Sequence, residues 1–236
     1  MIEMDVCVSC GVYAFNHPEN IFANIVTTGS EMAAIDLRHP LLRVSTAVGN
    51  DVSLGAHEQF YLLTGANMTG KSTFIRTIGV TNIVTNIGLP LPAKELSVPL
   101  VDLYTSMRIT DSVQDDISYF RAELNRIRAM MDKVSTSQQP FLVLLDEPLR
   151  GTNSTDKQQG TRAIVETLIT YNAVGIIATH DTGLCDMEAS HPDKISNYYF
   201  ESKVEEGELT FDFRIRRGAS TSNNATILMR QMGITR

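Results

Sequence analysis

Short, continuously apolar segments alternate along the chain with longer segments of helical spacing. Three segments are almost uninterrupted apolar runs, a pattern typical of strands that are buried on both faces of a sheet. They are Phe60–Thr64, Pro140–Leu145 and Ala173–Ala178. Lys194–Glu201 and Glu208–Ile215 are predicted to be two further strands, because a Glu-Glu-Gly turn lies between them. These five segments predict a mostly parallel sheet with an antiparallel edge.

Other apolar residues recur at helical spacing or lie in mixed segments. We predict one strand at Val98–Ser106 and a loop that Arg38-His39-Pro40 opens and that continues to Gly55. Helices between the strands would cover both faces of the sheet, so the predicted fold class is α/β. The predicted helices are Met1–Ala14, Thr73–Thr85, Asp115–Val134, Lys157–Tyr171 and Asn223–Met232.

Composition narrows the class of protein but does not give its function. The 236 residues are 43% hydrophobic and 20% charged, which suits one large globular domain or a domain with an appendage. A net charge of −7 argues against an electrostatic DNA-binding surface on average, although a local basic face or a DNA-binding region elsewhere in a longer parent stays open. No apolar run is long enough to span a membrane and no signal peptide is evident, so we expect a cytoplasmic protein without a membrane partner.

Three cysteines fit a reduced compartment better than a disulfide framework. Cys7 and Cys10 form a C-x-x-C pair, which a redox or zinc site could use. Such a site needs a βαβ context or a second Cys/His pair, and the sequence has neither. We therefore interpret the pair as two small apolar side chains on one face of a helix.

The most informative segment follows the predicted strand at residues 60–64. Residues 65–72 satisfy G-x-x-x-x-G-K-[ST], the P-loop motif, and a helical pattern follows them. The glycines let backbone N–H groups turn toward a phosphate, and the helix adds the positive end of its dipole. Lys71 would contact the β- and γ-phosphates of ATP, and Ser72 would bind Mg²⁺. The predicted nucleotide-binding residues are Gly65, Ala66, Asn67, Met68, Thr69, Gly70, Lys71, Ser72 and Thr73.

Two further strand ends carry side chains that suit hydrolysis of the bound nucleotide. Asp146 and Glu147 end the strand at residues 140–145. The first is placed to hold Mg²⁺ together with Ser72, and the second to orient or deprotonate the attacking water. His180 ends the next buried strand, where it can hydrogen-bond the γ-phosphate or that water. We predict that these groups meet at one edge of the sheet.

Four segments carry a family resemblance. Thr64–Thr73 reads T-G-A-N-M-T-G-K-S-T and resembles the T-G-P-N-M-G-G-K-S-T of the MutS family of DNA mismatch-repair ATPases. Ser118–Glu123 is similar to that family's S-T-F-x-x-E, and Asp146–Asp156 to its D-E-x-G-R-G-T-S-T-x-D. Ala178–His180 matches A-T-H. The resemblance spans essentially the whole chain in the expected order.

This resemblance implies a P-loop NTPase of the ABC-ATPase type that works as a homodimer through its ATPase face. ATP would lie between the P-loop of one subunit and Ser118 of the other, with Mg²⁺ on Ser72 and Asp146. Residues 21–236 would form the ATPase domain, and residues 1–20 would be the remnant of a helix that leads to missing N-terminal clamp domains. DNA would be held by those missing domains, and repair proteins are possible partners.

Departures from the family pattern indicate a divergent MutS-like branch. Where the family has Phe-x-x-Asn, with the Phe stacking on adenine, this chain has Ala47-Val48-Gly49-Asn50. Pro148-Leu149 replaces an aliphatic residue and glycine, and Asn223-Asn224-Ala225 replaces Ser-Tyr-Gly. These changes leave the predicted ATPase residues in place, but they argue against housekeeping mismatch repair.

Three functions fit the motifs to different degrees. The first is a Mg²⁺-dependent ATPase domain of a DNA mismatch-repair or DNA-processing protein, with Glu147 and His180 as its catalytic residues. The second is a nucleotide-gated module that binds DNA or protein with slow or no turnover. The third is an ABC ATPase of the transporter or chromosome-structure type, which the absence of Leu-Ser-Gly-Gly-Gln and of long helical arms disfavours.

Overall fold

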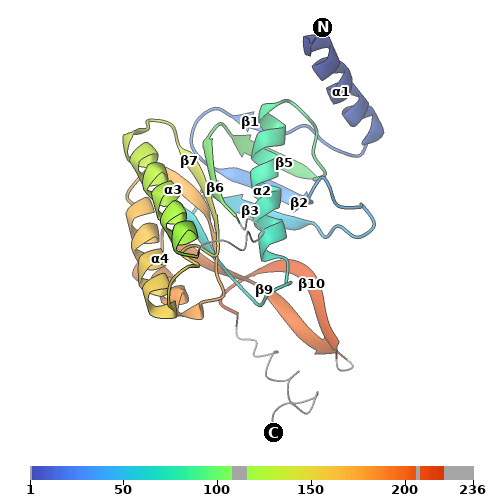
Figure 1. The fold of residues 1–236 in the computed structure, drawn as a ribbon. Helices are drawn as coiled ribbons and strands as arrows, with labels where there is room; N and C mark the ends of the chain where they lie inside the picture. Colours follow the sequence, from blue (N-terminus) through green and yellow to red (C-terminus); the bar gives the residue numbers. More distant parts are fainter. Residues whose placement is uncertain (1, 108–115, 206–207, 221–236) are drawn as a thin grey trace.

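A six-stranded sheet carries the predicted strand ends. The computed structural model describes residues 2–107, 116–205 and 208–220. In the order β10-β9-β4-β8-β7-β6, the five strands from β9 to β6 run parallel and β10 is antiparallel to β9 (Figure 1). The predicted mostly parallel sheet with an antiparallel edge is therefore confirmed. The strands are β4 (Phe60–Thr64), β6 (Asp102–Ser106), β7 (Phe141–Asp146), β8 (Ala173–Ala178), β9 (Ile195–Glu205) and β10 (Glu208–Arg217).

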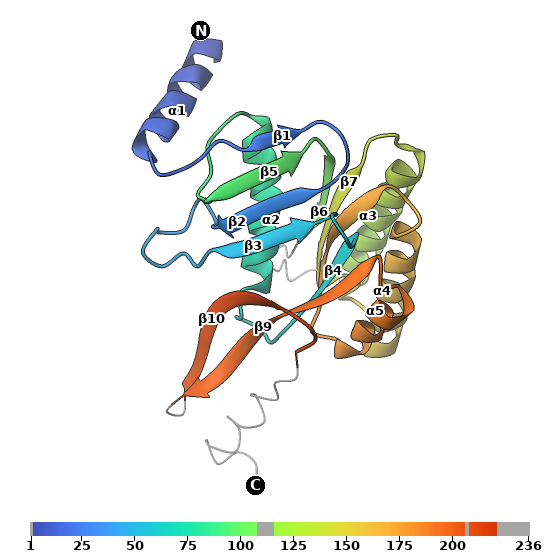
Figure 2. The same cartoon turned by 180° about the vertical axis from the view of Figure 1, so that it is seen from behind.

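A second sheet has four strands in the order β1-β5-β2-β3, and its existence was not predicted (Figure 2). The predicted single strand Val98–Ser106 is wrong, because the chain leaves one sheet after Pro99 and enters the other at Asp102. The predicted loop between Arg38 and Gly55 is also wrong in part, because β3 lies within it. The strands are β1 (Asn24–Val26), β2 (Met32–Leu37), β3 (Asn50–Leu54) and β5 (Glu95–Pro99).

Helices α2, α3 and α4 divide between the two faces of the six-stranded sheet, so helices cover both faces as predicted. On one face, α2 packs with the four-stranded sheet; on the other, α3 and α4 pack side by side (Figures 1 and 2). Strand β7 shows the division, because Leu142 and Leu144 contribute to the first core while Val143 and Leu145 contribute to the second. The helices are α1 (Ile2–Asn16), α2 (Lys71–Asn86), α3 (Asp116–Thr136), α4 (Ser154–Leu168) and α5 (Met187–Ser190), the last preceded by a 3₁₀ turn (Thr182–Asp186).

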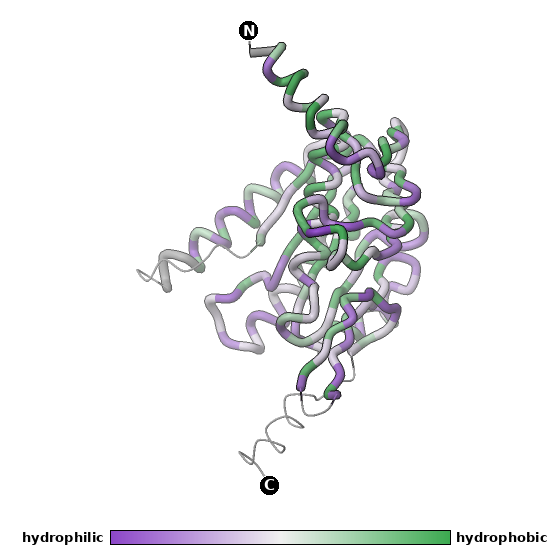
Figure 3. Tube along the Cα trace, turned by 90° about the vertical axis from the view of Figure 1, so that its right-hand side faces the viewer, coloured by the Kyte–Doolittle hydropathy of each residue, from purple (hydrophilic) through white to green (hydrophobic). Residues whose placement is uncertain are grey.

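Helix α1 projects away from the two cores (Figure 3). Several of its apolar side chains are exposed. Phe15 is 85% exposed, and Met4, Val6, Val8 and Val12 are also exposed. Among the described residues, none of the helices combines the length and hydropathy that a membrane crossing requires. The predicted closing helix at residues 223–232 lies outside the described residues.

Candidate functional site: a loop and three strand ends

The loop at residues 65–70 joins β4, in the middle of the six-stranded sheet, to α2. Gly65 and Gly70 both have positive φ, and a Cβ atom on Gly65 would lie 2.8 Å from the Phe200 carbonyl oxygen of β9. Glycine is therefore required at the start of the loop, where the backbone passes close to the neighbouring strand. Ala66, Asn67 and Met68 form the exposed crest of the loop.

Lys71 begins α2 and folds back over the loop. Its Nζ atom donates to the carbonyl oxygens of Gly65 at 2.6 Å and of Ala66 at 2.8 Å. Burial lowers the pKa of this amine, and the nearby carboxylates of Glu147 and Asp146 partly oppose that shift. The loop thus holds a buried ammonium group among carbonyl oxygens, beside the N-terminus of a long helix.

Ser72 and Asp146 meet as the sequence predicts. Ser72 Oγ donates to Asp146 Oδ2 at 2.6 Å, so the first turn of α2 contacts the end of β7. Asp146 is buried, whereas Ser72 is half-buried. A hydroxyl and a carboxylate oxygen are the hard ligands that Mg²⁺ prefers, and a bound ion would take further oxygens from phosphate and water. The donor set therefore fits Mg²⁺.

Glu147 lies directly after β7 in a left-handed conformation, with φ at 57°. Its backbone N–H donates to the Ala178 carbonyl of β8, and its Oε2 atom accepts from both Lys157 Nζ and His180 Nδ1 at 2.7 Å. Burial raises the pKa of this carboxyl, but the hydrogen bonds from Lys157 and His180 outweigh burial and hold the pKa below its usual range. The carboxyl is therefore an ionised group at neutral pH.

The three strand ends lie level with one another. Leu63 of β4 pairs with Ala178 of β8, which pairs in turn with Asp146 of β7. This register brings the loop, the two carboxylates and His180 to one edge of the sheet, as predicted. His180 is 64% exposed and contacts Glu147 directly. Ser118 lies in the first turn of α3, and its side chain is outside the described part of the chain.

Leu149 has a positive φ of 60°, where the family resemblance led us to expect glycine. Two contacts hold this conformation. The buried Glu123 carboxylate accepts a hydrogen bond from the Leu149 N–H at 3.0 Å, and the Leu149 side chain is packed within the core beneath α3 and α4. Because a left-handed leucine is strained, the packing of its side chain must offset that strain.

An apolar cavity of about 280 Å³ lies beside the loop, between α2, β10 and the segment before β3. Gly70 and Thr73 line it on the side of the loop, and aromatic rings line it from two strands. A Cβ atom on Gly70 would lie 3.2 Å from Phe213 Cδ1, so the Phe213 ring is close to the glycine before Lys71. The aromatic and aliphatic lining residues are Leu37, Leu42, Val48, Phe74, Phe200 and Phe213.

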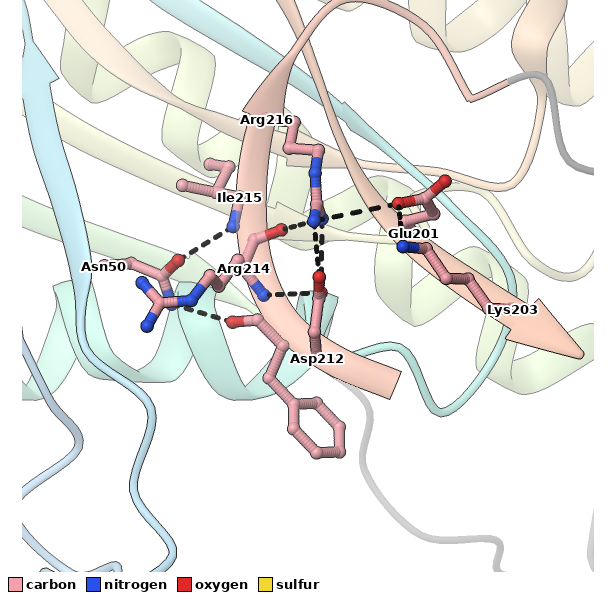
Figure 4. Close-up of polar contacts among 8 residues, drawn as sticks. Asn50, Glu201, Lys203, Asp212, Arg214, Ile215 and Arg216 are labelled. Carbon is pink, nitrogen blue, oxygen red and sulfur yellow. Dashed lines mark hydrogen bonds and ion pairs between the residues drawn. The ribbon is translucent and has the colours of Figure 1, made fainter. Parts of the chain in front are cut away.

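Asn50 fixes the strand segment that supplies Phe213. Its Nδ2 atom donates to the Phe213 carbonyl at 3.0 Å, and its Oδ1 atom accepts from the Ile215 N–H at 2.7 Å (Figure 4). The pairing of β10 with β9 is irregular between Phe211 and Ile215, and Phe213 has a positive φ of 55°. One side chain from the four-stranded sheet thus satisfies the backbone of a bulge in the other sheet.

Comparison with known sequences identifies the family. A sequence profile of MutS domain V matches residues 61–234, which is most of the chain. The chain belongs to the MutS family. A DNA mismatch repair protein MutS from Thermotoga neapolitana is 34% identical over 192 residues, which cover 80% of this chain and 24% of that protein.

Two further relatives give the same result. DNA mismatch repair proteins MutS from Fervidobacterium nodosum and Natronomonas pharaonis are 33% and 30% identical, over 76% and 84% of this chain and 21% and 23% of their own length. The chain therefore spans about a quarter of the length of these curated relatives.

Two contacts in this MutS family domain, those of Lys157 and Phe213, were not predicted from the sequence. Lys157 was assigned only to a helix, because nothing in its spacing from Glu147 indicates that the two side chains meet. Phe213 was assigned only to a strand, because the bulge that turns it toward the loop depends on Asn50, which lies far away in the sequence. The alternation of apolar residues in β10 gave no signal of the contact between Phe213 and the loop.

Proposed function

We propose that this MutS family domain is a P-loop ATPase of the ABC type that binds and hydrolyses ATP with Mg²⁺. One observation carries the proposal: neighbouring strand ends bring Lys71, the Ser72–Asp146 pair and Glu147 to one edge of the sheet. Those groups supply phosphate binding, metal binding and a proton acceptor, which are the components that phosphoryl transfer to water requires.

Lys71 and the first turn of α2 bind the phosphates in this proposal. The ammonium group of Lys71 exchanges the loop carbonyls of Gly65 and Ala66 for β- and γ-phosphate oxygens, which carry more negative charge. Ser72 and Asp146, whose side chains contact each other, would supply oxygen ligands to Mg²⁺. When bound, Mg²⁺ neutralises charge that develops on the phosphates.

Glu147 is the proton acceptor for the attacking water in this proposal. Its carboxyl is ionised and buried, so it accepts the proton of a water molecule that is aligned with the γ-phosphorus. His180 is exposed enough to contact the γ-phosphate from the edge of the same site. The positions of both side chains at the ends of β7 and β8 support these roles.

The apolar cavity beside the loop accommodates the base of the nucleotide. Ala47 supplies no ring there, but Phe213 does, and its position against Gly70 places an aromatic ring beside the phosphate-binding loop. Stacking between a base and an aromatic side chain contributes about 1–3 kcal/mol in other nucleotide sites. Phe213 therefore replaces the stacking contact that the Ala47 position lacks.

In the whole protein, we propose that two such domains form a homodimer with composite sites. Ser118 of one copy would complete the site of the other, and DNA and any repair partners would be bound through parts of the protein outside this chain. Helix α1 would connect to those parts, and its exposed apolar side chains support an additional packing partner.

Turnover measured against protein concentration tests this proposal. If two copies complete each site, phosphate release per molecule from ATP and Mg²⁺ should rise more than tenfold as the chain is concentrated past its dimerisation constant. Lys71→Ala should abolish ATP binding at every concentration. Tight ATP binding without turnover at any concentration would instead support a nucleotide-gated binding module. Failure to bind ATP would contradict both functions.

A further inference from the structure

We propose that Lys157 is a positioning residue that fixes the Glu147 carboxylate for hydrolysis. Lys157 lies in the first turn of α4, and its Nζ atom is 2.7 Å from Glu147 Oε2. The two side chains are only 12% and 9% exposed. A buried ion pair of this geometry restrains both groups far more than a surface pair does. The proposal rests on the proposed ATPase function.

Lys157 is a rigid anchor because the start of α4 is itself fixed. Asn153 caps the helix by accepting from the Asp156 N–H at 2.9 Å, and its Nδ2 atom donates to the Asp156 carboxylate at 2.7 Å. Further along, Val165 and Leu168 of α4 are fully buried in the core. The backbone beneath Lys157 therefore has little freedom to move.

Lys157 and His180 both bind the same oxygen of Glu147, but their surroundings differ. His180 is largely exposed, whereas Lys157 is almost buried. An exposed imidazole can turn toward a ligand, and it then leaves Lys157 as the remaining donor to Oε2. The ion pair thus keeps the carboxylate in place while His180 moves.

The other oxygen of the carboxylate is available to a ligand. Glu147 Oε1 is buried and has no hydrogen-bond partner among the described residues. Buried acceptors are nearly always satisfied, and this one lies next to the proposed phosphate site, where a bound ligand would supply its partner. With Oε2 held by Lys157, Oε1 is the atom that would accept the proton of the attacking water.

Orientation, rather than basicity, is the expected contribution of the pair. A cation beside the carboxylate keeps it ionised but also weakens its affinity for a proton. Loss of Lys157 would therefore make Glu147 a slightly stronger base in a less defined position. Because small misplacements of a catalytic group lower rates strongly, we expect the loss of position to dominate.

The test compares Lys157→Met, Lys157→Arg and a control on the same helix. Arg162→Met removes another contact from α4 to a carboxylate, the one to Asp186 at the end of the 3₁₀ turn. We expect Lys157→Met to lower kcat for ATP hydrolysis at least tenfold while the Kd for ATP changes less than threefold. Lys157→Arg should restore kcat to within about threefold, and Arg162→Met should leave it unchanged.

A second measurement needs no turnover. A double-mutant cycle compares the unfolding equilibrium constants of four chains: the parent, Lys157→Met, Glu147→Gln and the double variant. A direct ion pair should make the combined effect differ from the product of the single effects by about fivefold or more. A parent that does not hydrolyse ATP contradicts the proposed function, whereas additive effects in this cycle contradict the role of Lys157 whatever the parent does. An unchanged or increased kcat in Lys157→Met would also overturn it.

Discussion

Asn50 Nδ2 donates a hydrogen bond to the backbone carbonyl of Phe213, across the boundary between the two sheets. The same side chain accepts from the Ile215 N–H, so one residue of β3 holds both sides of the bulge in β10. The Phe213 ring lines the apolar cavity next to Gly70. The shape of the proposed base site therefore depends on a residue that has no place in the phosphate-binding motif.

Replacing Asn50 with alanine should weaken ATP binding about tenfold, because two hydrogen bonds of about 1 kcal/mol each stabilise the bulge. Binding of inorganic tripolyphosphate should change less than twofold, because it does not use the apolar cavity. Calorimetric titration of both ligands measures the difference. Asn24→Ala, an exposed asparagine in the same small sheet, is the matched control. Equal losses for both ligands would mean that Asn50 supports the loop rather than the base site.

Replacing Lys71 with methionine should abolish ATP binding, while the free energy of unfolding at pH 7.5 stays within about 1 kcal/mol of the parent. Methionine keeps the apolar packing of a buried side chain and removes a charge that burial destabilises. Denaturant titration and calorimetry measure the two effects. A large loss of stability would show that the contacts of Lys71 with the loop are structural.

The difference in unfolding free energy between the parent and Lys71→Met should depend on pH. Because the pKa of Lys71 is lowered in the folded chain, the unfolded chain binds this proton more tightly. The Lys71 contribution to stability should therefore rise with pH between that lowered pKa and the ordinary lysine value of about 10.4. We expect the parent to gain stability relative to Lys71→Met between pH 7.5 and 9.5. The unfolding free energies of both chains at the two pH values measure this gain.

At position 149, glycine should be better tolerated than alanine. Both substitutions remove a buried side chain and should destabilise the fold by about 2–4 kcal/mol. Glycine, however, adopts the positive φ of this position without strain, so Leu149→Gly should be about 1 kcal/mol more stable than Leu149→Ala. Denaturant titration of the two variants measures the difference. The reverse order would contradict backbone strain at Leu149.

The sequence predicted the large sheet well, because buried parallel strands such as β7 and β8 are continuous apolar runs. The prediction failed for the small sheet, where β3 reads Asn-Asp-Val-Ser-Leu and buries only Val52 and Leu54. Two buried residues in five cannot be distinguished from a loop. Likewise, Leu100 and Val101 between the two strands are apolar, so the change of sheet between Pro99 and Asp102 left no clear signal.

The residues of the proposed site also fall into a group that the sequence predicts and a group that it does not. The predicted group belongs to short motifs that follow strands, so parallel topology alone brings its members together. These residues are Lys71, Ser72, Asp146 and Glu147. Lys157 and Phe213 reach the site through tertiary packing, one from the first turn of a helix and one from a bulge. Such contacts depend on the relative placement of whole elements, which local sequence patterns do not specify.

The most direct test of the account is single-turnover hydrolysis by Glu147→Gln. Glutamine keeps the size of the side chain but cannot accept the proton of water. We predict that the variant binds ATP and Mg²⁺ with a Kd within about threefold of the parent and hydrolyses ATP at least about 100-fold more slowly. Hydrolysis by the variant at the rate of an active parent would contradict the assignment of Glu147 as the proton acceptor of an ATPase.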